Sequence, residues 1–384
     1  MKICILTSSY PVDLNGEDIS GLFARDFALE LVGRGHEVTV ITPRRNNNVS
    51  RDTQINIIAF KWLFGQNKLA SLRLSSFMDV VRICSVILFG QYNVLKFLKK
   101  EKVDFVVAMW AVPAGFWAYI ANFFTKTPYG VWCLGSDIWI YGRNNKTKWI
   151  IRNILRRSRV AYADGEGLRT EIEKLSGKKC YFLPTSRNLD VTNTSAVDPY
   201  NNGRKNFLFV GRYHSSKGAD VLIDAINLIP NTLHGTLNFE LYGNGEDRLV
   251  LENKVKEYGL TNVSINGFAD PNKLVSLMKY AHFVIIPSRF DSIPVVFSEA
   301  LQCKVPMITS DVGDLKFLIE NYKIGFVFEK ENTAQLAELI VKASQQDRAN
   351  FTDGLDRALE IFDVKKAANK LVTDFSNERL NYDR

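Results

Sequence analysis

The stretch KICILTSSYPVDLNGEDISGLFARDFALELVGRGHEVTVITP, residues 2–43, decides the fold class. Its first residues are apolar and predict a buried strand, and the polar residues over 8–21 predict a loop. Phe23, Phe27 and Leu31 then recur at helical spacing, and the apolar run after them predicts a second strand. Strands that alternate with helices in this way are typical of a parallel sheet covered by helices on both faces.

The same alternation restarts in the second half of the chain. Residues 206–228 predict a strand, a loop and a helix in that order, and further apolar strands follow. Residues 184–204 are rich in Asn, Thr, Ser, Pro and Gly, which is a linker composition. We therefore expect an α/β protein of two Rossmann-like, doubly wound domains, 1–200 and 201–361. Ligands would bind at the carboxyl ends of the strands, where the domains face each other across a cleft.

The composition describes a globular chain with a one-sided charge. Its 384 residues are 46% hydrophobic and 23% charged, which excludes wholesale disorder. Five scattered cysteines and four distant histidines show neither disulfide nor metal-ligand spacing, so we expect no metal. The net charge is +8, and the first 200 residues hold 27 basic and 17 acidic side chains. This excess favours an anionic partner for the first half, whether a membrane surface, a lipid phosphate or a nucleic acid.

One uncharged segment, residues 105–124, is long enough to cross a bilayer. Pro113 and Gly115 interrupt it, so we favour a strand over 103–109, a loop and a buried helix over a transmembrane helix. The apolar run at the N-terminus is too short for the core of a signal peptide. These features predict a cytoplasmic location.

The loop VGRYHSSKG, residues 210–218, is the first candidate for chemistry. Gly211 lets the backbone turn off the preceding strand, and Arg212 and Lys217 place two cations on a loop that opens a helix. Two cations beside a helix N-terminus suit a diphosphate. The alternative is a pair of solvated basic side chains.

The segment PSRFDSIPVVFSEAL, residues 287–301, is the most informative pattern. Asp291 lies in the loop after a strand, Pro294 suits the first turn of the next helix, and Glu299 lies one or two turns inside that helix. Acidic side chains suit vicinal hydroxyl groups, as on a ribose or a hexose. The alternative is a capping aspartate and a surface glutamate.

Two further patterns are less specific. Gly243-Asn244-Gly245 follows a strand and predicts either close approach of a ligand or an ordinary turn. Asp137 follows an apolar strand, and an aspartate at the carboxyl end of a strand faces the ligand in this fold class. The alternative for Asp137 is a helix N-cap.

A series of motifs along the chain resembles glycosyltransferase family 4. In order, these motifs are YP…SG, GHEVTVITP, GSDIW, VGR…KG, YGNG, and DSIPVVFSEAL with DVG after it. The likeness runs from Ile3 to about Phe328, and members are retaining enzymes of the two-domain GT-B fold. It implies transfer of a hexose-type sugar from a nucleotide-diphosphate sugar, of UDP or GDP type, to an acceptor hydroxyl without a metal or other cofactor. It also implies that a C-terminal helix, 362–384, joins the first domain.

The resemblance and the patterns together give the expected site. Arg212 and Lys217 would neutralise the leaving diphosphate, and Asp291 would contact the donor sugar. The expected catalytic residues are Arg212, Lys217, Asp291 and Asp137. The expected donor-binding residues are Gly21, Gly211, Gly243, Asn244, Ser292, Ile293, Pro294 and Glu299. Among these, Glu299 would bind the ribose and Gly21 would let a loop close on the donor.

Four positions depart from the family pattern. Asp291 stands where the family usually has Glu, Leu134 where many members have His, and Lys304 and Asp314 where it has glycine. These departures leave open a catalytically weak or inactive nucleotide-sugar-binding protein, and the fold also admits a nucleotide-sugar epimerase. Charge alone would fit a nucleic-acid binder, but no recognition motif is present, so we expect no nucleic-acid partner.

Residues 138–163 hold seven cations and no acidic residue, and Trp149 and several isoleucines lie between them. A helix here would be basic and amphipathic, the pattern of interfacial binding. We therefore expect a peripheral protein whose first domain docks on the anionic inner face of the cell membrane and takes a surface saccharide or a lipid-linked acceptor. The alternative is an ordinary surface helix with a basic outer face.

Overall fold

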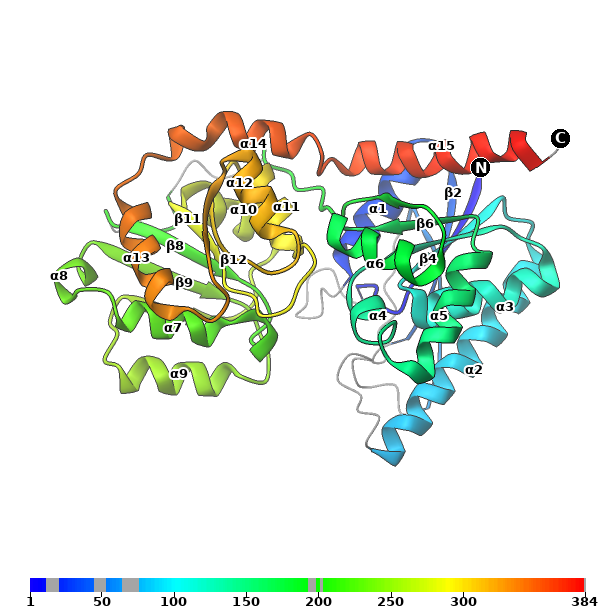
Figure 1. Ribbon diagram of the computed structural model, residues 1–384, viewed down its shortest axis with the longest axis horizontal. Helices are drawn as coiled ribbons and strands as arrows, with labels where there is room; N and C mark the ends of the chain where they lie inside the picture. The colour runs from blue at the N-terminus through cyan, green and yellow to red at the C-terminus, as the bar shows by residue number, and fades with distance from the viewer. Residues whose placement is uncertain (12–20, 45–52, 64–75, 193–197, 201–202, 383–384) are drawn as a thin grey trace. The chain divides into compact units, whose positions relative to one another are not determined.

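The structure, a computed structural model, describes residues 1–11, 21–44, 53–63, 76–192, 198–200 and 203–382. It divides the chain into two compact units (Figure 1). Unit 1 consists of Met1–Thr185 and Val364–Arg384, and unit 2 is Ser186–Asp363.

The chain therefore passes between the units twice, at residues 185–186 and 363–364. The first boundary lies at 186, whereas the linker composition predicted 201. The physical reason is that two residues of the predicted linker, Arg187 and Tyr200, already form hydrogen bonds with other residues of unit 2. Arg187 Nη1 lies 3.0 Å from Glu299 Oε1, and Tyr200 Oη donates to the carbonyl of Leu277 at 3.0 Å.

Unit 1 contains a sheet of seven parallel strands in the order β3-β2-β1-β4-β5-β6-β7. The strands are β1 (Lys2–Leu6), β2 (Glu37–Pro43), β3 (Asn56–Phe60), β4 (Phe105–Met109), β5 (Tyr129–Cys133), β6 (Val160–Ala163) and β7 (Cys180–Phe182). Every residue of β4, β5 and β6 is buried, because helices cover both faces of the sheet.

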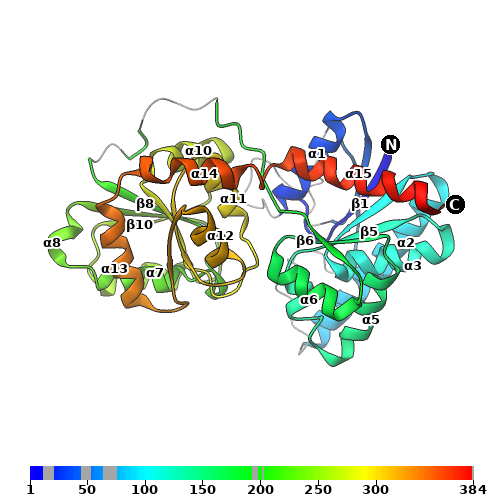
Figure 2. The ribbon, with the colours of Figure 1, turned by 45° about the horizontal axis from the view of Figure 1, so that its top comes forward.

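The helices of unit 1 fall on the two faces of this sheet. They are α1 (Leu22–Gly33), α2 (Phe77–Lys100), the π-type turn η2 (Ala111–Gly115), α3 (Phe116–Thr125), α4 (Ser136–Trp139), α5 (Asn145–Arg157), α6 (Glu166–Ser176) and α15 (Val364–Tyr382). Helices α1 and α15 lie side by side on one face, and α2, α3 and α5 pack together on the other (Figures 1 and 2). The uncharged segment 105–124 is strand β4, turn η2 and most of α3, so its prediction as strand, loop and helix is confirmed.

The C-terminal helix α15 is an integral part of unit 1, where the resemblance implied a helix over 362–384. Phe375 stacks on Phe105 of β4 with ring centroids 3.9 Å apart. A Cβ at Gly130 of β5 would lie 2.9 Å from the ring of Phe375, so the helix sits directly on the central strands. The guanidinium of Arg34, at the end of α1, also donates to the carbonyl of Lys365 at 3.0 Å.

Unit 2 contains a sheet of six parallel strands in the order β10-β9-β8-β11-β12-β13. The strands are β8 (Lys205–Val210), β9 (Leu237–Tyr242), β10 (Val263–Asn266), β11 (Phe283–Ile286), β12 (Met307–Ser310) and β13 (Gly325–Phe328). The helical segments are η3 (Ser215–Lys217), α7 (Ala219–Asn227), α8 (Asn231–His234), α9 (Arg248–Glu257), α10 (Pro271–Tyr280), α11 (Val295–Gln302), α12 (Leu315–Tyr322), α13 (Thr333–Ser344), η4 (Arg348–Phe351) and α14 (Thr352–Leu359). Both sheets have the doubly wound order, so the predicted α/β class with two Rossmann-like units is confirmed.

Candidate active site

The strand order of unit 2 places its switch point between β8 and β11. The chain builds the sheet outward from β8 through β9 to β10, and then returns to add β11 on the other side of β8. The loops after β8 and β11 therefore leave the carboxyl edge of the sheet in opposite directions and open a crevice between them. In this fold class the crevice is where ligands bind.

Glycines draw the loops at this edge into direct backbone contact. A Cβ at Gly243, after β9, would lie 1.9 Å from the carbonyl oxygen of Gly211, after β8. Gly218 has φ +70° at the start of α7, and a Cβ there would lie 1.9 Å from the carbonyl oxygen of Pro287, after β11. Only glycine allows such approaches. The predicted site glycines Gly211 and Gly243 thus hold the loops together.

Lys217 and Asp291, both predicted catalytic residues, meet across the switch point. Lys217 Nζ lies 2.7 Å and 2.8 Å from the two carboxylate oxygens of Asp291. The side chains are 28% and 17% exposed, so the pair faces solvent at the carboxyl edge and is not sealed in the core. A lysine ammonium group has three donors. Asp291 takes two of them, which leaves one donor for a phosphate oxygen.

Arg212, the second predicted cation, follows Gly211 directly on the same loop as Lys217. It is half-exposed. Within the described parts of the chain, no hydrogen bond or ion pair of its guanidinium is found, whereas its carbonyl accepts from the His214 N–H at 2.8 Å. The loop therefore carries two cations: Lys217, which is paired with Asp291, and Arg212, whose charge is not neutralised by the described residues.

The predicted donor-binding segment Ser292-Ile293-Pro294 leads into α11. All three residues are buried, and Pro294 is the N-cap residue of the helix, without a side-chain capping bond. The Ser292 carbonyl accepts from the Asp314 N–H at 3.3 Å. This contact ties the loop after β12 to the start of α11. Asp314 has an ordinary backbone conformation, with φ −95°, so the aspartate in place of the family's glycine fits without strain.

Glu299, the predicted ribose ligand, lies in α11 and is buried in an ion pair. Its Oε1 is 3.0 Å from Nη1 of Arg187, and both side chains are 7% exposed. Arg187 was not among the predicted site residues, because it lies in a segment whose composition predicted a linker. The alternative prediction for Glu299, a surface glutamate, is excluded by the burial of this side chain.

Asn244, another predicted donor-binding residue, shapes the turn after β9. Its carbonyl accepts from the Tyr213 N–H at 3.0 Å, and its side-chain oxygen accepts from the Gly245 N–H at 2.9 Å. The hydroxyl of Tyr213 lies 2.7 Å from the carbonyl oxygens of both Leu241 and Asn266. Asn244 and Tyr213 therefore fix the loops after β8 and β9 against each other.

Arg289 is a second residue that sequence analysis missed, although it stands inside the quoted segment 287–301. Its guanidinium donates to both carboxylate oxygens of Asp220 at 2.8 Å and 2.7 Å, and to Glu331 at 2.9 Å. Hydrogen bonds to Asp220 raise the pKa of Arg289 despite burial. Burial alone would raise the pKa of Asp220, but Arg289 outweighs it and lowers that pKa. This charged network fastens the loop after β11 to the first turn of α7.

Unit 1 contributes two predicted site residues, and one of them needs correction. Asp137 is 1% exposed, and its carboxylate accepts from the backbone N–H groups of Ala111 at 2.7 Å and Leu134 at 3.2 Å. Burial raises the pKa of Asp137, and these hydrogen bonds offset the increase only in part. Asp137 therefore fastens turn η2 to the end of β5. The interpretation as a catalytic group facing a ligand does not fit this burial.

Gly21, the other predicted residue of unit 1, starts α1 with φ +87°. A Cβ there would lie 2.3 Å from the carbonyl oxygen of Ser9, so glycine is required by close packing. Most of the loop before it, residues 12–20, lies outside the described residues, and its predicted closure on a donor stays a prediction.

Unit 1 also has a cavity of about 440 Å³, but it lies at the opposite edge of the sheet. Its lining comes from the amino ends of β1 to β4 and from the last turns of α2, and includes Lys2, Glu37, Asn56, Lys96 and Lys100. In the described part of the chain, no group of three or more His, Cys, Asp or Glu side chains is placed to hold a metal ion.

The comparisons with known proteins agree with this architecture. Residues 190–354, within unit 2, match the family model of glycosyl transferases group 1. The chain is 26% identical over 270 residues to an uncharacterized glycosyltransferase of Methanocaldococcus jannaschii, covering 70% of this chain and 73% of that protein. It is 24% identical to Bacillus subtilis TuaC, a glycosyltransferase assigned to teichuronic acid biosynthesis, over 97% of each chain.

Solved structures show the same fold over the whole length. Anabaena HepE, crystallised in complex with UDP-glucose, superposes with a TM-score of 0.74 at 18% identity, covering 98% of this chain and 100% of that chain. The chain is therefore a glycosyltransferase with the two-domain GT-B fold, and the match to the group 1 family model lies within unit 2. The expectation of a glycosyltransferase is confirmed, while membership of family 4 in particular stays a prediction.

Proposed function

We propose that this glycosyltransferase moves a hexose-type sugar from a nucleotide-diphosphate sugar to an acceptor hydroxyl with retention of the anomeric configuration. The observation that carries the proposal is the pair of Lys217 and Asp291 at the switch point of unit 2. The pair brings a cation for the leaving group and a carboxylate for sugar hydroxyls to the same place. The resemblance to family 4 supports the retaining outcome.

The chemistry of the step assigns each group a task. As the bond between the anomeric carbon and the diphosphate breaks, negative charge grows on the diphosphate oxygens. Lys217 and Arg212 stabilise that charge, and such donors act most strongly in the transition state. Asp291 accepts hydrogen bonds from hydroxyl groups of the sugar while it holds Lys217 in place. Glu299 accepts hydrogen bonds from the ribose hydroxyls.

These two cations supply the charge that a divalent metal supplies in other phosphate-binding enzymes, so we expect turnover without a metal. Turnover should therefore persist when EDTA is added at a concentration that removes free divalent ions. Loss of turnover in EDTA that Mg²⁺ or Mn²⁺ restores would contradict this part of the proposal.

A donor screen tests the proposal as a whole. UDP and GDP sugars are added separately, and thermal unfolding is followed. A ligand at about one hundred times its dissociation constant stabilises the protein by about 2.7 kcal/mol. The HepE complex with UDP-glucose supports starting with UDP sugars. Product anomers from the donor that binds are then assigned by NMR. Inversion would contradict the retaining mechanism, and the absence of any shift across the panel would contradict the donor class.

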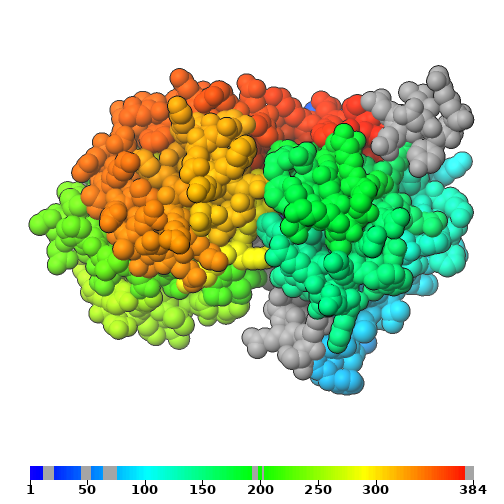
Figure 3. All heavy atoms as spheres, in the orientation of Figure 1, coloured from blue at the N-terminus to red at the C-terminus, as the bar shows by residue number. Residues whose placement is uncertain are grey.

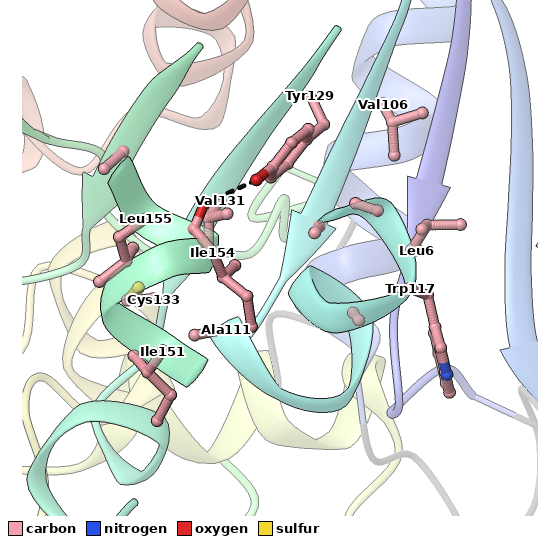
Figure 4. Packing of buried hydrophobic residues seen from close by; sticks show 14 of the residues in the cluster. Leu6, Val106, Ala111, Trp117, Tyr129, Val131, Cys133, Ile151, Ile154 and Leu155 are labelled. Carbon is pink, nitrogen blue, oxygen red and sulfur yellow. Dashed lines mark hydrogen bonds between the residues drawn. The ribbon is translucent and has the colours of Figure 1, made fainter. Parts of the chain in front are cut away.

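We further propose that unit 1 docks on an anionic membrane face to reach a surface saccharide or a lipid-linked acceptor in polysaccharide biosynthesis. The structure changes which helix would do this. The apolar residues Ile151, Ile154 and Leu155 of α5 point inward and are fully buried in the core, next to β5 (Figure 4). Trp149 alone among the large apolar side chains of α5 is highly exposed, at 70%. Helix α5 therefore offers cations but little apolar surface.

Helix α2 offers the apolar surface instead. Among the described residues it is the one helix whose length and hydropathy would allow a membrane crossing, yet Val86, Val94 and Leu98 pack into the core. Its outer side chains form what we call the α2 surface: Phe77, Met78, Leu88, Phe89 and Tyr92. The first turns of α2 lie openly at the surface in the space-filling view (Figure 3). Exposed lysines lie at the C-terminal end of α2, so the helix carries both the apolar α2 surface and cationic groups.

Vesicle co-sedimentation tests this docking. The protein is mixed with vesicles of phosphatidylcholine alone or of phosphatidylcholine with phosphatidylglycerol. We expect binding to the anionic vesicles and its loss in Leu88→Gln, because Leu88 is 69% exposed on the α2 surface. Leu249→Gln is the matched control, since Leu249 is 67% exposed on α9 of unit 2. Equal binding by both variants, or no preference for anionic lipid, would contradict the proposal.

A further inference from the structure

Helix α11 is attached to the first residues of unit 2 by both a side chain and the backbone. The guanidinium of Arg187 reaches the carboxylate of Glu299 at 3.0 Å, with both side chains 7% exposed. One turn further along α11, Gln302 donates to the carbonyl of Arg187 at 2.9 Å and accepts from the Leu189 N–H at 2.9 Å. The main chain and the side chain of Arg187 are therefore both fixed relative to α11.

The last residues of unit 2 reinforce the same attachment. Phe362 lies against Phe297 of α11 with ring centroids 5.2 Å apart. The Ser186 hydroxyl donates to the carbonyl of Phe362 at 2.5 Å. The residues that open and close unit 2 thus meet at α11. The contacts of Arg187 with Glu299 and Gln302 lie within unit 2.

We infer that Arg187 is a positioning residue for the donor nucleotide: it orients the Glu299 carboxylate toward the ribose hydroxyls. This inference rests on the proposed function, which assigns the ribose to Glu299. A carboxylate buried to this extent is costly unless a cation and hydrogen bonds compensate it. Nη1 of the planar, forked guanidinium holds Glu299 Oε1 at 3.0 Å, so the ion pair fixes the position of the carboxylate and compensates its charge. A side chain that binds two vicinal hydroxyls needs such a fixed position.

A merely structural ion pair would behave differently. Its loss would lower the stability of unit 2 and weaken every nucleotide ligand to a similar extent. Loss of a positioning residue weakens only those ligands that contact Glu299. The two roles are therefore separated by a ligand that lacks the ribose hydroxyls but keeps the base and the diphosphate.

The test measures dissociation constants by calorimetry for the full chain and its Arg187→Met variant. The probes are UDP and 2′,3′-dideoxy-UDP, or the guanine pair if the donor screen selects GDP. We expect Arg187→Met to weaken the ribonucleotide on the order of tenfold to a hundredfold, since small misplacements of binding groups have effects of that size. The dideoxy nucleotide should bind both proteins equally. In steady-state kinetics the donor KM should rise more than kcat falls.

Arg348→Met is the matched control. Arg348 is a half-buried arginine of unit 2, and it donates to the backbone carbonyls of Lys279 at 2.6 Å, Ala281 at 2.8 Å and Lys304 at 3.1 Å. Its loss should lower the unfolding temperature and leave the discrimination between ribose and dideoxyribose unchanged. Arg187→Lys keeps the charge without the fork, and should show the same selective loss to a smaller degree. If Arg187→Met does not fold, Arg187→Lys alone decides the question.

Equal weakening of both nucleotides by the Arg187 variants, or unchanged binding of the ribonucleotide, would overturn the inference. The wild-type protein would still bind UDP or GDP in either case, so the proposed function would stand. Failure of the wild-type protein to bind any nucleoside diphosphate would overturn the proposed function and the inference with it.

Discussion

The carboxyl edges of the two sheets have the same strand order around the switch point and quite different contents. In unit 2, backbone contacts at glycine bring four loops together, and the partly exposed pair of Lys217 and Asp291 lies among them. In unit 1, the acidic residue after a central strand, Asp137, is buried and bonded to backbone N–H groups. The comparison teaches that a strand-end aspartate can stay accessible to solvent in one sheet and be buried as part of the architecture in the other. Burial, which the fold class does not fix, decides between them.

The largest expected effect comes from removing the positive charge of Lys217 in unit 2. Lys217→Ala should lower kcat by about 10²- to 10³-fold, because a donor to the developing charge of the diphosphate is lost. Steady-state turnover with the donor found in the screen measures the effect. Lys254→Ala is the matched control, since Lys254 is paired to Asp224 at 2.7 Å and is 25% exposed, close to the 28% of Lys217. Comparable turnover in the two variants would remove Lys217 from the site.

The converse change in unit 1 should affect stability and not chemistry. Asp137→Ala leaves the N–H groups of Ala111 and Leu134 without their acceptor, which should lower the free energy of unfolding by about 2–4 kcal/mol. Urea denaturation measures the loss, and turnover per folded molecule should stay near the wild-type value. A variant that folds as well as the wild type but turns over a hundredfold more slowly would return Asp137 to the catalytic residues.

A smaller change tests whether the loops of unit 2 must touch. Gly243→Ala puts a Cβ 1.9 Å from the Gly211 carbonyl oxygen, so the loops after β8 and β9 must separate. Such overpacking should lower stability by about 1–3 kcal/mol and raise the donor KM. Gly235→Ala is the control, because nothing lies within 4 Å of the added Cβ and its φ of −70° is ordinary. Unchanged stability and KM in Gly243→Ala would show that the contact is not needed.

The smallest expected effect lies away from the site, at Lys304. This residue has φ +53°, where the family pattern has glycine. The left-handed conformation costs a side-chain-bearing residue about 1–2 kcal/mol, while glycine adds disorder to the unfolded chain. Lys304→Gly should therefore stabilise unit 2 by about 0.5–1 kcal/mol, even though it loses a solvent-exposed ion pair with Asp356. Differential scanning calorimetry measures the shift, and a lower unfolding temperature would contradict the argument.

The sequence predicts most of the fold because the fold depends on periodicity. Apolar strands alternate with helices, and the broken segment around Pro113 forms a strand, a turn and a helix as expected. It also locates the loops of unit 2, because Gly, Lys and Asp mark strand ends. What periodicity cannot show is whether the apolar side of an amphipathic helix meets the core or a membrane. Ile151 and Ile154 of α5 lie in the core, and the apolar exposure lies on α2 instead.

The contacts of Arg187 and Asp137 could not be predicted, for a different reason. Arg187 lies in a stretch whose composition is that of a linker, and composition carries no information on long-range partners. Its partner Glu299 is more than one hundred positions away. Asp137 was misassigned because its position at the end of a strand is visible in the sequence, whereas its backbone partner Ala111 belongs to a separate loop. Only the folded arrangement brings such pairs together.

Helix α15 has a consequence for how the protein is made. Unit 1 combines residues 1–185 with residues 364–384, and Phe375 lies on Phe105 in its core. A ribosome releases residues 364–384 only after residues 1–363 have emerged. Unit 2 is continuous from 186 to 363, so it can complete its core while unit 1 still waits for its final helix. A premature stop codon just after unit 2 would therefore spare unit 2 and damage unit 1, which was translated first.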